Sequence, residues 1–196
     1  MYKINKIKAC VEIYTRYIKE VSKMNPVLQN ILTRRSVRAF TDKKISREDL
    51  NLILKAGIYA PSGMNKQTWQ FTVIQNQNKI QELAKAIGKS LKRDANYNFY
   101  GPDTIILLSN EKDNSNGLAD CSCALQNIFL MANELGIGSC WINQLKTICD
   151  ELEIRSLLNS YGIPENHIVW GIAVLGYPEK PNEIKPKNES VIKFVD

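Results

Sequence analysis

Apolar residues recur along this chain with two periods, which predict a mixture of helices and strands. From Ile4 to Val21 the apolar positions are spaced three and four apart, with Lys and Glu between them, a pattern typical of an amphipathic helix. The same reasoning predicts helices over residues 26–34, 46–60, 79–92, 116–135 and 151–160. Apolar runs predict buried strands over residues 104–108 and 168–177, and shorter strands over residues 71–75 and 139–142.

The first predicted helix ends before Pro26, because the residue ahead of a proline resists helical geometry. An amphipathic helix can bind a membrane surface or a partner, but packing on the main body also explains the pattern, and we favour that interpretation. We assign this helix no catalytic role. The chain then divides into an appended helix, residues 1–25, and one domain, residues 26–196, with an extended C-terminal arm.

The arm begins after Pro178 and is rich in Pro, Lys, Glu and Asn. It closes with a strand-like apolar segment, residues 191–195. A strand-like segment behind a long arm needs a sheet edge with which to pair, and that edge can belong to another subunit. Taken together, the elements predict an α+β domain with a central sheet of four or five strands flanked by helices.

Length and composition narrow the class of protein. The chain has 196 residues, of which 44% are hydrophobic and 23% charged, so a disordered or fibrous protein is excluded. The apolar runs are far shorter than the ~20 residues that span a bilayer, and no secretory signal pattern follows the basic start. We therefore expect a cytoplasmic protein.

Cysteine and histidine limit the chemistry. The five cysteines include no C-x-x-C pair, so neither a zinc site of usual spacing nor a disulfide framework is expected, and no metal is predicted. We expect most of the cysteines to be small buried apolar residues. The single histidine, His167, lies in an apolar run and is interpreted as a structural residue.

The charge is concentrated near the N-terminus. The formal net charge is +6, but residues 1–47 carry twelve Lys and Arg against three Asp and Glu, whereas residues 48–196 carry fourteen against seventeen. This distribution favours an anionic partner for the first quarter of the chain. A small phosphorylated ligand, a nucleic acid and an acidic membrane are all compatible with it.

Three polar clusters are not explained by packing. The first is the sequence RRSVR, residues 34–38. Arg suits bidentate phosphate contact, and in an extended segment Arg34, Ser36 and Arg38 share one side. A solvated basic turn and a nucleic-acid site are the alternatives, but basic residues elsewhere are balanced by acids and no aromatic–basic alternation appears.

The second cluster is PSGMNKQTW, residues 61–69, and it follows a predicted helix. Asn65 and Gln67 each carry a donor and an acceptor, which suits the edge of a heterocycle. The third cluster is GIGSCWINQ, residues 136–144. Because it follows a helix and precedes a strand, it is not a dinucleotide fingerprint. Its glycines are expected to cap the helix and to let the backbone approach something flat.

Together, in this order, the clusters resemble the FMN-dependent nitroreductase family. The resemblance runs from about residue 31 to residue 195 and includes the helix from Asp120 to Leu135 and the buried strand that ends at Gly176-Tyr177-Pro178. It implies an α+β fold with a mostly antiparallel sheet, a homodimer with FMN at the subunit interface, and an arm that reaches over the partner. The departures are Thr68 in place of the usual proline, the extra N-terminal helix, and a short stretch where larger members have a substrate lid.

The resemblance also implies which residues bind FMN. Arg34 and Ser36 would hold the phosphate and ribityl end, with Arg35 beside them. Arg38 would lie near flavin N1 and O2. Asn65 would meet the pyrimidine edge, and the backbone after residue 142 would face N5. The other implied residues are Pro61, Ser62, Gly63 and Gln67 in the second cluster, Ile142, Asn143 and Gln144 in the third, and Lys185 and Lys187 in the arm.

The function that this resemblance implies is an oxidoreductase that uses NAD(P)H and FMN to reduce a small oxidant, such as a nitroaromatic or a quinone, by ping-pong transfer of two electrons. The cofactor then performs the chemistry, so no acid–base pair is required of the protein. A specialised flavoenzyme of the same fold, such as a dehalogenase or a flavin-consuming enzyme, is the main alternative. A basic nucleic-acid-binding module is the alternative from another class.

Overall fold

The computed structural model describes residues 25–181, 187–188 and 191–195. The helix predicted within residues 1–25 therefore lies outside the described residues. Contacts divide the chain between Arg34 and Arg35 into two units. The first unit contains α2 (Pro26–Thr33), which begins where the Asn25 side chain accepts a hydrogen bond from the Val27 N–H, at 2.9 Å.

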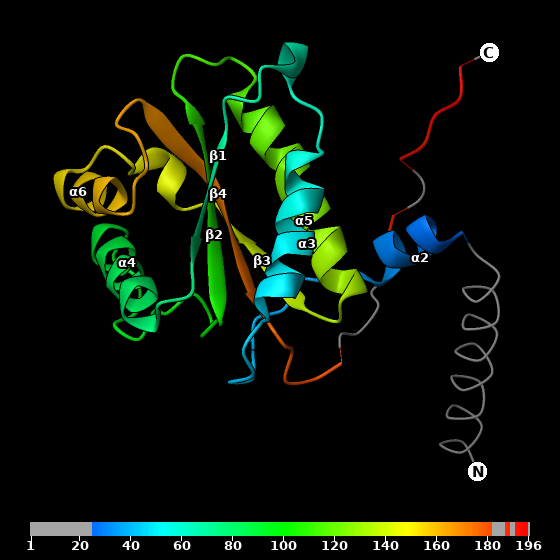
Figure 1. The fold of residues 1–196 in the computed structure, drawn as a ribbon, viewed down its shortest axis with the longest axis horizontal. Coiled ribbons are helices and arrows are strands. Elements are labelled where there is room, and N and C mark those ends of the chain that lie inside the picture. Colours follow the sequence, from blue (N-terminus) through cyan, green and yellow to red (C-terminus); the bar gives the residue numbers. More distant parts are fainter. Residues whose placement is uncertain (1–24, 182–186, 189–190, 196) are drawn as a thin grey trace. The chain divides into compact units, whose positions relative to one another are not determined.

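The second unit is built on a four-stranded antiparallel sheet, as predicted (Figure 1). Its strands are β1 (Gln70–Ile74), β2 (Thr104–Glu111), β3 (Gly138–Ile142) and β4 (His167–Gly176), in the order β1-β2-β4-β3. The two central strands are the two with the longest apolar runs, because both of their faces are covered. β1 and β3 form the edges.

Helices cover both faces of the sheet (Figure 1). One face carries α3 (Arg47–Ile58) and α5 (Gly117–Glu134), and the other carries α4 (Gln77–Ser90) and α6 (Leu152–Ser160). Successive side chains of a strand point to opposite faces, so in β2 Ile105 and Leu107 join the α4 side of the core, whereas Ile106 and Leu108 join the α5 side. The α+β prediction is therefore confirmed.

The helix boundaries follow the expected capping chemistry. Ser46 caps α3 through its hydroxyl, which accepts from the Asp49 N–H at 3.0 Å. Gly136, at φ +69°, ends α5 as predicted. At Gly138 the close neighbour is Val37: a Cβ there would lie 2.7 Å from its side chain, so this glycine makes room for another part of the same chain.

That part is the segment from Ser36 to Thr41, which pairs with the sheet outside its named strands. Ser36 bridges Ser139 in parallel, and the Val37 N–H donates to the Ser139 carbonyl at 2.9 Å. The Thr41 N–H donates to the Tyr177 carbonyl at 2.8 Å. Val37 and Phe40 point inward and are buried, in the spaces beside Gly138 and Gly176. The basic segment is therefore fixed to the end of the sheet.

The arm differs from the pattern-based expectation. Residues 191–195 form no strand in the single chain, and Val191, Phe194 and Val195 are largely exposed. The apolar pattern of these residues predicts pairing with a sheet edge, and that pairing is not formed within the single chain.

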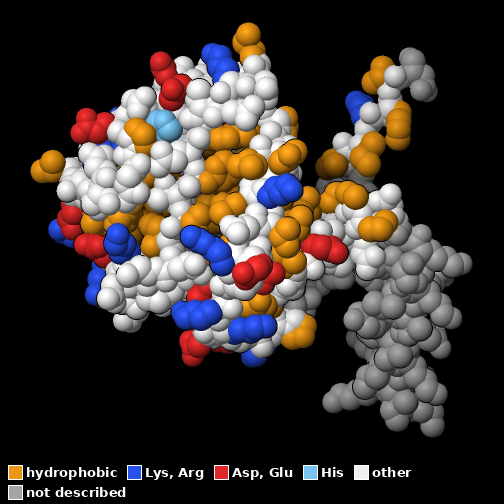
Figure 2. Space-filling view, in the orientation of Figure 1, with side chains coloured by type: hydrophobic (Ala, Val, Ile, Leu, Met, Phe, Trp, Pro, Cys, Tyr) orange, Lys and Arg blue, Asp and Glu red, His pale blue; other side chains and the backbone are white. Residues whose placement is uncertain are grey.

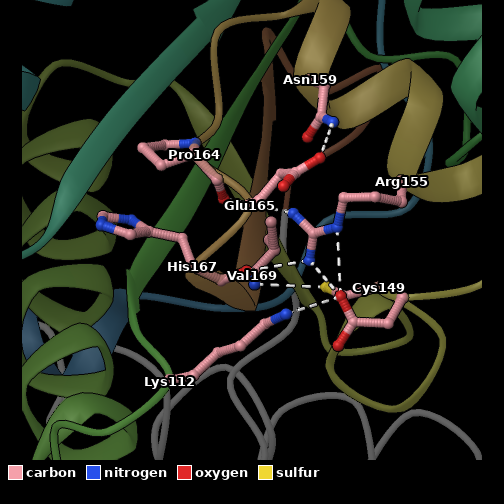
Figure 3. A network of polar contacts seen from close by, with 9 residues as sticks. Lys112, Cys149, Arg155, Asn159, Pro164, Glu165, His167 and Val169 are labelled. Atoms are coloured by element: carbon pink, nitrogen blue, oxygen red, sulfur yellow. Dashed lines mark hydrogen bonds and ion pairs between the residues drawn. The ribbon is translucent and has the colours of Figure 1, made fainter.

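An ion-pair network ties the start of α6 to β4 (Figure 3). Asp150 accepts from Lys112 and from Arg155, both at 2.8 Å, and Arg155 also donates to the His167 carbonyl at 2.9 Å. The Lys112 hydrogen bond, with help from Arg155, lowers the pKa of Asp150. Cys149 lies beside the network and accepts from the Val169 N–H at 3.3 Å. Of the cysteines in the described part of the chain, Cys121, Cys140 and Cys149 are buried as expected, and Cys123 is exposed.

His167 is buried, and its Nδ1 atom lies 3.1 Å from the Ser109 hydroxyl oxygen. This environment agrees with the interpretation of His167 as a structural residue. Burial lowers its pKa. The unfolded imidazole gains a proton below about pH 6.5 while the native one stays neutral, so the unfolded state binds more protons. We expect the free energy of unfolding to fall as pH drops from about 7 to 5.

The measurement is urea unfolding at both pH values for the wild type and for His167→Gln. The variant should lose less stability on acidification than the wild type does. Equal losses in the two proteins would contradict the assignment.

The C-terminus of α4 is strained. After the cap at Leu91, the Lys92 N–H donates to the Lys89 carbonyl and the Arg93 N–H to the Gly88 carbonyl, at 3.4 and 2.8 Å, which is the Schellman pattern. The position occupied by Lys92, at φ +50°, favours glycine. The left-handed backbone of a side-chain-bearing residue costs about 1–2 kcal/mol.

Lys92→Gly should therefore stabilise the protein by about 0.5–1 kcal/mol, after the greater freedom of glycine in the unfolded chain is deducted. Chemical denaturation measures the change. Lys85→Gly, inside the same helix, is the matched control and should destabilise the protein by about 1 kcal/mol. A loss of stability in Lys92→Gly would contradict the strain argument.

Candidate functional site

The basic segment presents its polar residues to solvent. Ser36 and Arg38 are exposed on either side of the buried Val37, as expected for an extended segment. The Arg38 guanidinium lies 5.9 Å from the centre of the Tyr100 ring, a contact that orients the cation. Arg35 is partly buried, and Arg34 ends the first unit as the cap residue of α2.

The loop between α3 and β1 contains most of the second cluster. It includes a single 3₁₀ turn, η1 (Gly63–Asn65), and the turn is closed by a hydrogen bond from the Asn65 N–H to the Ser62 carbonyl at 2.9 Å. The Gln67 side-chain amide donates to Asn65 Oδ1 at 2.9 Å. The two amides therefore act as one exposed unit, while Pro61 is an exposed residue ahead of the turn.

This loop is strained at three side-chain-bearing residues. Met64, Asn65 and Gln67 have φ between +51° and +55°, a region that costs free energy for any residue with a Cβ. Strain of this kind persists where surrounding contacts hold it, and it clusters at functional sites. The side chain of Met64 is 89% exposed, so packing does not explain the conformation.

Asp120, in the first turn of α5, holds the loop in place. It is buried, and its Oδ1 accepts from the Gly63 N–H at 2.9 Å. Asn114 lies 3.4 Å from Asp120 Oδ2 and donates to the Thr68 hydroxyl at 3.0 Å. The Thr68 hydroxyl donates in turn to Asn110 at 2.6 Å. Sequence reasoning missed these supporting residues; the one available signal was an acidic residue inside a mostly apolar helix.

The third cluster contains the edge strand β3 and the two residues that follow it. Ile142 is buried, Asn143 is exposed, and Gln144 accepts from the Tyr97 hydroxyl at 2.6 Å. Burial raises the pKa of Tyr97 well above its usual value, so this phenol stays protonated and donates. Tyr97 was also missed from the sequence, because no motif connects it to residue 144.

The predicted residues do not all converge within one chain. The register places Ser139, and with it Ser36, level with Thr104 at one end of β2. The loop of the second cluster is bonded to Asn110 near the other end. Six residues of strand span about 20 Å, and Figure 1 shows the two segments at opposite ends of the sheet. Of the predicted arm lysines, Lys187 is exposed and Lys185 lies outside the described residues.

The chemistry of these groups suits an anionic heterocyclic ligand. Ser36 and Arg38 offer a hydroxyl and a permanent cation to an anion. Asn65 and Gln67 offer amide donors and acceptors to a ring edge. In the part of the chain that the structure describes, no three His, Cys, Asp or Glu side chains gather as metal ligands, and no helix combines the length and apolar character needed to cross a bilayer.

Comparison with known proteins identifies the family. The family model described as "Nitroreductase family" matches residues 31–177. A protein from Archaeoglobus fulgidus with the provisional name NADH dehydrogenase/NAD(P)H nitroreductase is 35% identical over 162 residues, which cover 80% of this chain and 87% of the relative. The chain therefore belongs to the nitroreductase family, and the resemblance drawn from the three clusters is confirmed.

Solved structures support the same conclusion. The crystal structure of a nitroreductase with bound FMN from Bacteroides fragilis has a TM-score of 0.82 and 41% identity, covering 88% of this chain and all of that one.

A further sequence relative is an iodotyrosine deiodinase from Thermotoga neapolitana. It is 25% identical over 180 residues, which cover 82% of this chain and 93% of the relative.

Removal of the Asp120 carboxylate should release the loop. Asp120→Ala leaves the partly buried Gly63 N–H without its acceptor, which costs about 1–3 kcal/mol of stability. Asp120→Asn retains a side-chain oxygen and should cost less. Denaturant unfolding measures both losses, and hydrogen exchange at Gly63 should quicken most in the alanine variant. If Asp120→Asn lost as much stability as Asp120→Ala, the hydrogen bond to Gly63 would not be what holds the loop.

Proposed function

We propose that this protein is an FMN-dependent oxidoreductase that takes hydride from NAD(P)H and passes two electrons to a small oxidant by a ping-pong mechanism. The single observation that carries the proposal is the basic segment held outward at the sheet end by backbone pairing, in a chain that matches the nitroreductase family over residues 31–177. The similarity to an FMN-bound nitroreductase supports the choice of cofactor.

The residues present fit FMN. Its phosphate is a dianion, and the exposed Ser36 and Arg38 belong to a segment in which three of five residues are Arg. We assign Arg34, Arg35 and Ser36 to the phosphate and ribityl end. The hydrogen-bonded pair of Asn65 and Gln67 suits the pyrimidine edge of the ring, because this pair offers both donors and acceptors.

When bound, FMN supplies the acceptor and donor of hydride. Arg38 would stabilise negative charge on the N1 side of the ring. A fixed cation at about 4 Å contributes up to about 4 kcal/mol at an effective dielectric of 20, and solvent reduces this figure for an exposed side chain. The Tyr100 ring, 5.9 Å from the guanidinium, keeps the cation oriented. The backbone of Ile142, Asn143 and Gln144 would face N5, with Tyr97 fixing the Gln144 side chain.

A homodimer explains why the predicted residues lie at two ends of one sheet. The basic segment of one subunit and the Pro61–Gln67 loop of a second copy would meet across the interface and enclose one flavin between them. Exposed apolar side chains support such an interface, since isolated monomers rarely expose large apolar patches. Figure 2 shows apolar side chains gathered over the middle of one face, where β1 and α3 lie. The exposed apolar side chains of the domain include Ile58, the last residue of α3, and Tyr59 next to it.

A specialised dehalogenase is the second candidate, because the iodotyrosine deiodinase from Thermotoga neapolitana is among the similar proteins. The two candidates share a cofactor and differ in the oxidant. Turnover of a nitroaromatic or a quinone, compared with release of halide from a halophenol, separates them.

The test of the proposed function follows the colour of the flavin. Protein reconstituted with FMN should bind about one FMN per chain, and anaerobic NADH or NADPH should bleach its visible absorbance. A nitroaromatic or a quinone added afterwards should restore the colour without a ternary complex. Protein that holds FMN but is reduced by neither nicotinamide would defeat the proposal.

The matched variants are Arg38→Gln and Arg38→Lys. Loss of the cation should lower the two-electron potential of the flavin by about 20–40 mV, while lysine should retain most of it. If the flavin potential were unchanged in both variants, the assignment of Arg38 to the N1 side of the ring would be wrong.

A further inference from the structure

A basic hollow at the C-terminal end of α4 contains none of the residues assigned above to direct contact with the flavin. Its volume is about 250 Å³. It is lined by Lys85, Lys89, Lys92 and Arg93, with one carboxylate, Asp94, among them. Lys89 is also paired with Glu153 at 2.6 Å, outside the hollow. Among the described residues, no carboxylate forms an ion pair with Lys85, Lys92 or Arg93, so the hollow has a net positive charge.

Lys92 has a left-handed backbone conformation that is more favourable for glycine than for lysine. Its Schellman position favours glycine, yet a lysine occupies it at φ +50°. Cations near a helix C-terminus interact favourably with the helix dipole, but Lys89 already supplies that interaction in the last turn. An observed strain of this kind indicates that the side chain itself has a role.

The shape of the hollow depends on a residue without a side chain. At Gly88, a Cβ would find its nearest neighbours at 3.7 Å, on Tyr97, and at 4.0 Å, on Arg93. A longer side chain at this position would occupy the space between these two residues. The hollow is therefore built from the helix end, Gly88 and Tyr97, and does not result from mobile lysines alone.

Tyr97 connects the hollow to the proposed flavin site. Its ring lines the hollow, and its hydroxyl donates to Gln144 at 2.6 Å. Gln144 belongs to the stretch assigned above to flavin N5, the atom that receives hydride. One side chain thus lies between the cations of the hollow and the residue assigned above to flavin N5.

We propose that this hollow binds the phosphate groups of the nicotinamide coenzyme, with Lys92 and Arg93 as the principal contacts. The inference rests on the proposed function, because it assumes that NAD(P)H delivers hydride beside Gln144. A dinucleotide carries its negative charge away from the nicotinamide ring, and guanidinium and ammonium groups recognise phosphate through charge-assisted hydrogen bonds. The hollow also predicts that NADP(H), with one more phosphate than NAD(H), binds more tightly.

The experiment uses the full chain loaded with FMN and the variants Lys92→Gly and Arg93→Gln. Lys92→Gly relieves strain and should keep the fold intact. Calorimetry with NADP⁺ should show the Kd rising about three- to tenfold in each variant. Stopped-flow reduction by NADPH should show a similar loss of apparent affinity. Reduction by 1-benzyl-1,4-dihydronicotinamide, which has no phosphate, should be unchanged. Lys55→Gln, in the last turn of α3, is the control for loss of one positive charge and should change none of these values.

Each outcome separates this inference from the proposed function. If the variants bind NADP⁺ as tightly as the wild type does, or lose NADPH and the phosphate-free reductant equally, the hollow is not the phosphate site. If neither reductant bleaches the flavin, the proposed function fails. A selective loss of NADP⁺ binding in the variants would still support the hollow as the coenzyme site in that case.

Discussion

The pairing of residues 36–41 with the sheet end is the interaction on which the candidate site depends. Two glycines make it possible: a Cβ at Gly138 or Gly176 would lie within 3 Å of Val37 or Phe40. With Val37 buried, alternation along the extended segment directs its neighbours Ser36 and Arg38 to solvent. The Glu179 N–H bonds back to the Ala39 carbonyl at 3.2 Å, so the same contact fixes the start of the arm.

The sheet also separates the residues that the family resemblance groups together. Antiparallel register leaves about 20 Å between the basic segment and the amide-bearing loop. The homodimer proposed above would remove that separation, because each chain would then supply one surface to each of two equivalent sites. The proposal of an interfacial flavin thus follows from strand register as much as from resemblance.

Backbone strain marks the segments to which function is assigned. The side-chain-bearing residues with positive φ are Met64, Asn65, Gln67, Lys92, Phe99 and Tyr100 in the described part of the chain. The first three form the loop proposed to face the ring, Lys92 lines the basic hollow, and Tyr100 contacts Arg38. Each of these conformations costs free energy that glycine would save. Five of the six residues lie at or beside a proposed site, whereas Phe99 is buried in the core.

The sequence predicted more of the fold than of the candidate site. The helices and strands between residues 26 and 176 were predicted within a few residues, since helical and strand periodicities are local properties of the chain. The strand-like segment 191–195 forms no strand in the single chain. In β4 the apolar run predicted a fully covered strand, and Ser46 predicted the start of α3. The three clusters also indicated the family, because their order and residue types are themselves features of sequence.

The contacts that hold the site could not be predicted in this way. Asp120 supports a glycine 57 residues away, and Tyr97 bonds a glutamine 47 residues away. No periodicity relates such positions. The basic hollow could not be predicted for the same reason. In the sequence its lysines have the pattern of a solvated helix face, and only the Schellman turn and the position of Tyr97 show that they line a hollow. The sequence by itself determined the elements and the chemical character of the clusters. Only the tertiary structure decided which clusters meet, because strand register and helix packing, rather than position along the chain, bring distant side chains together.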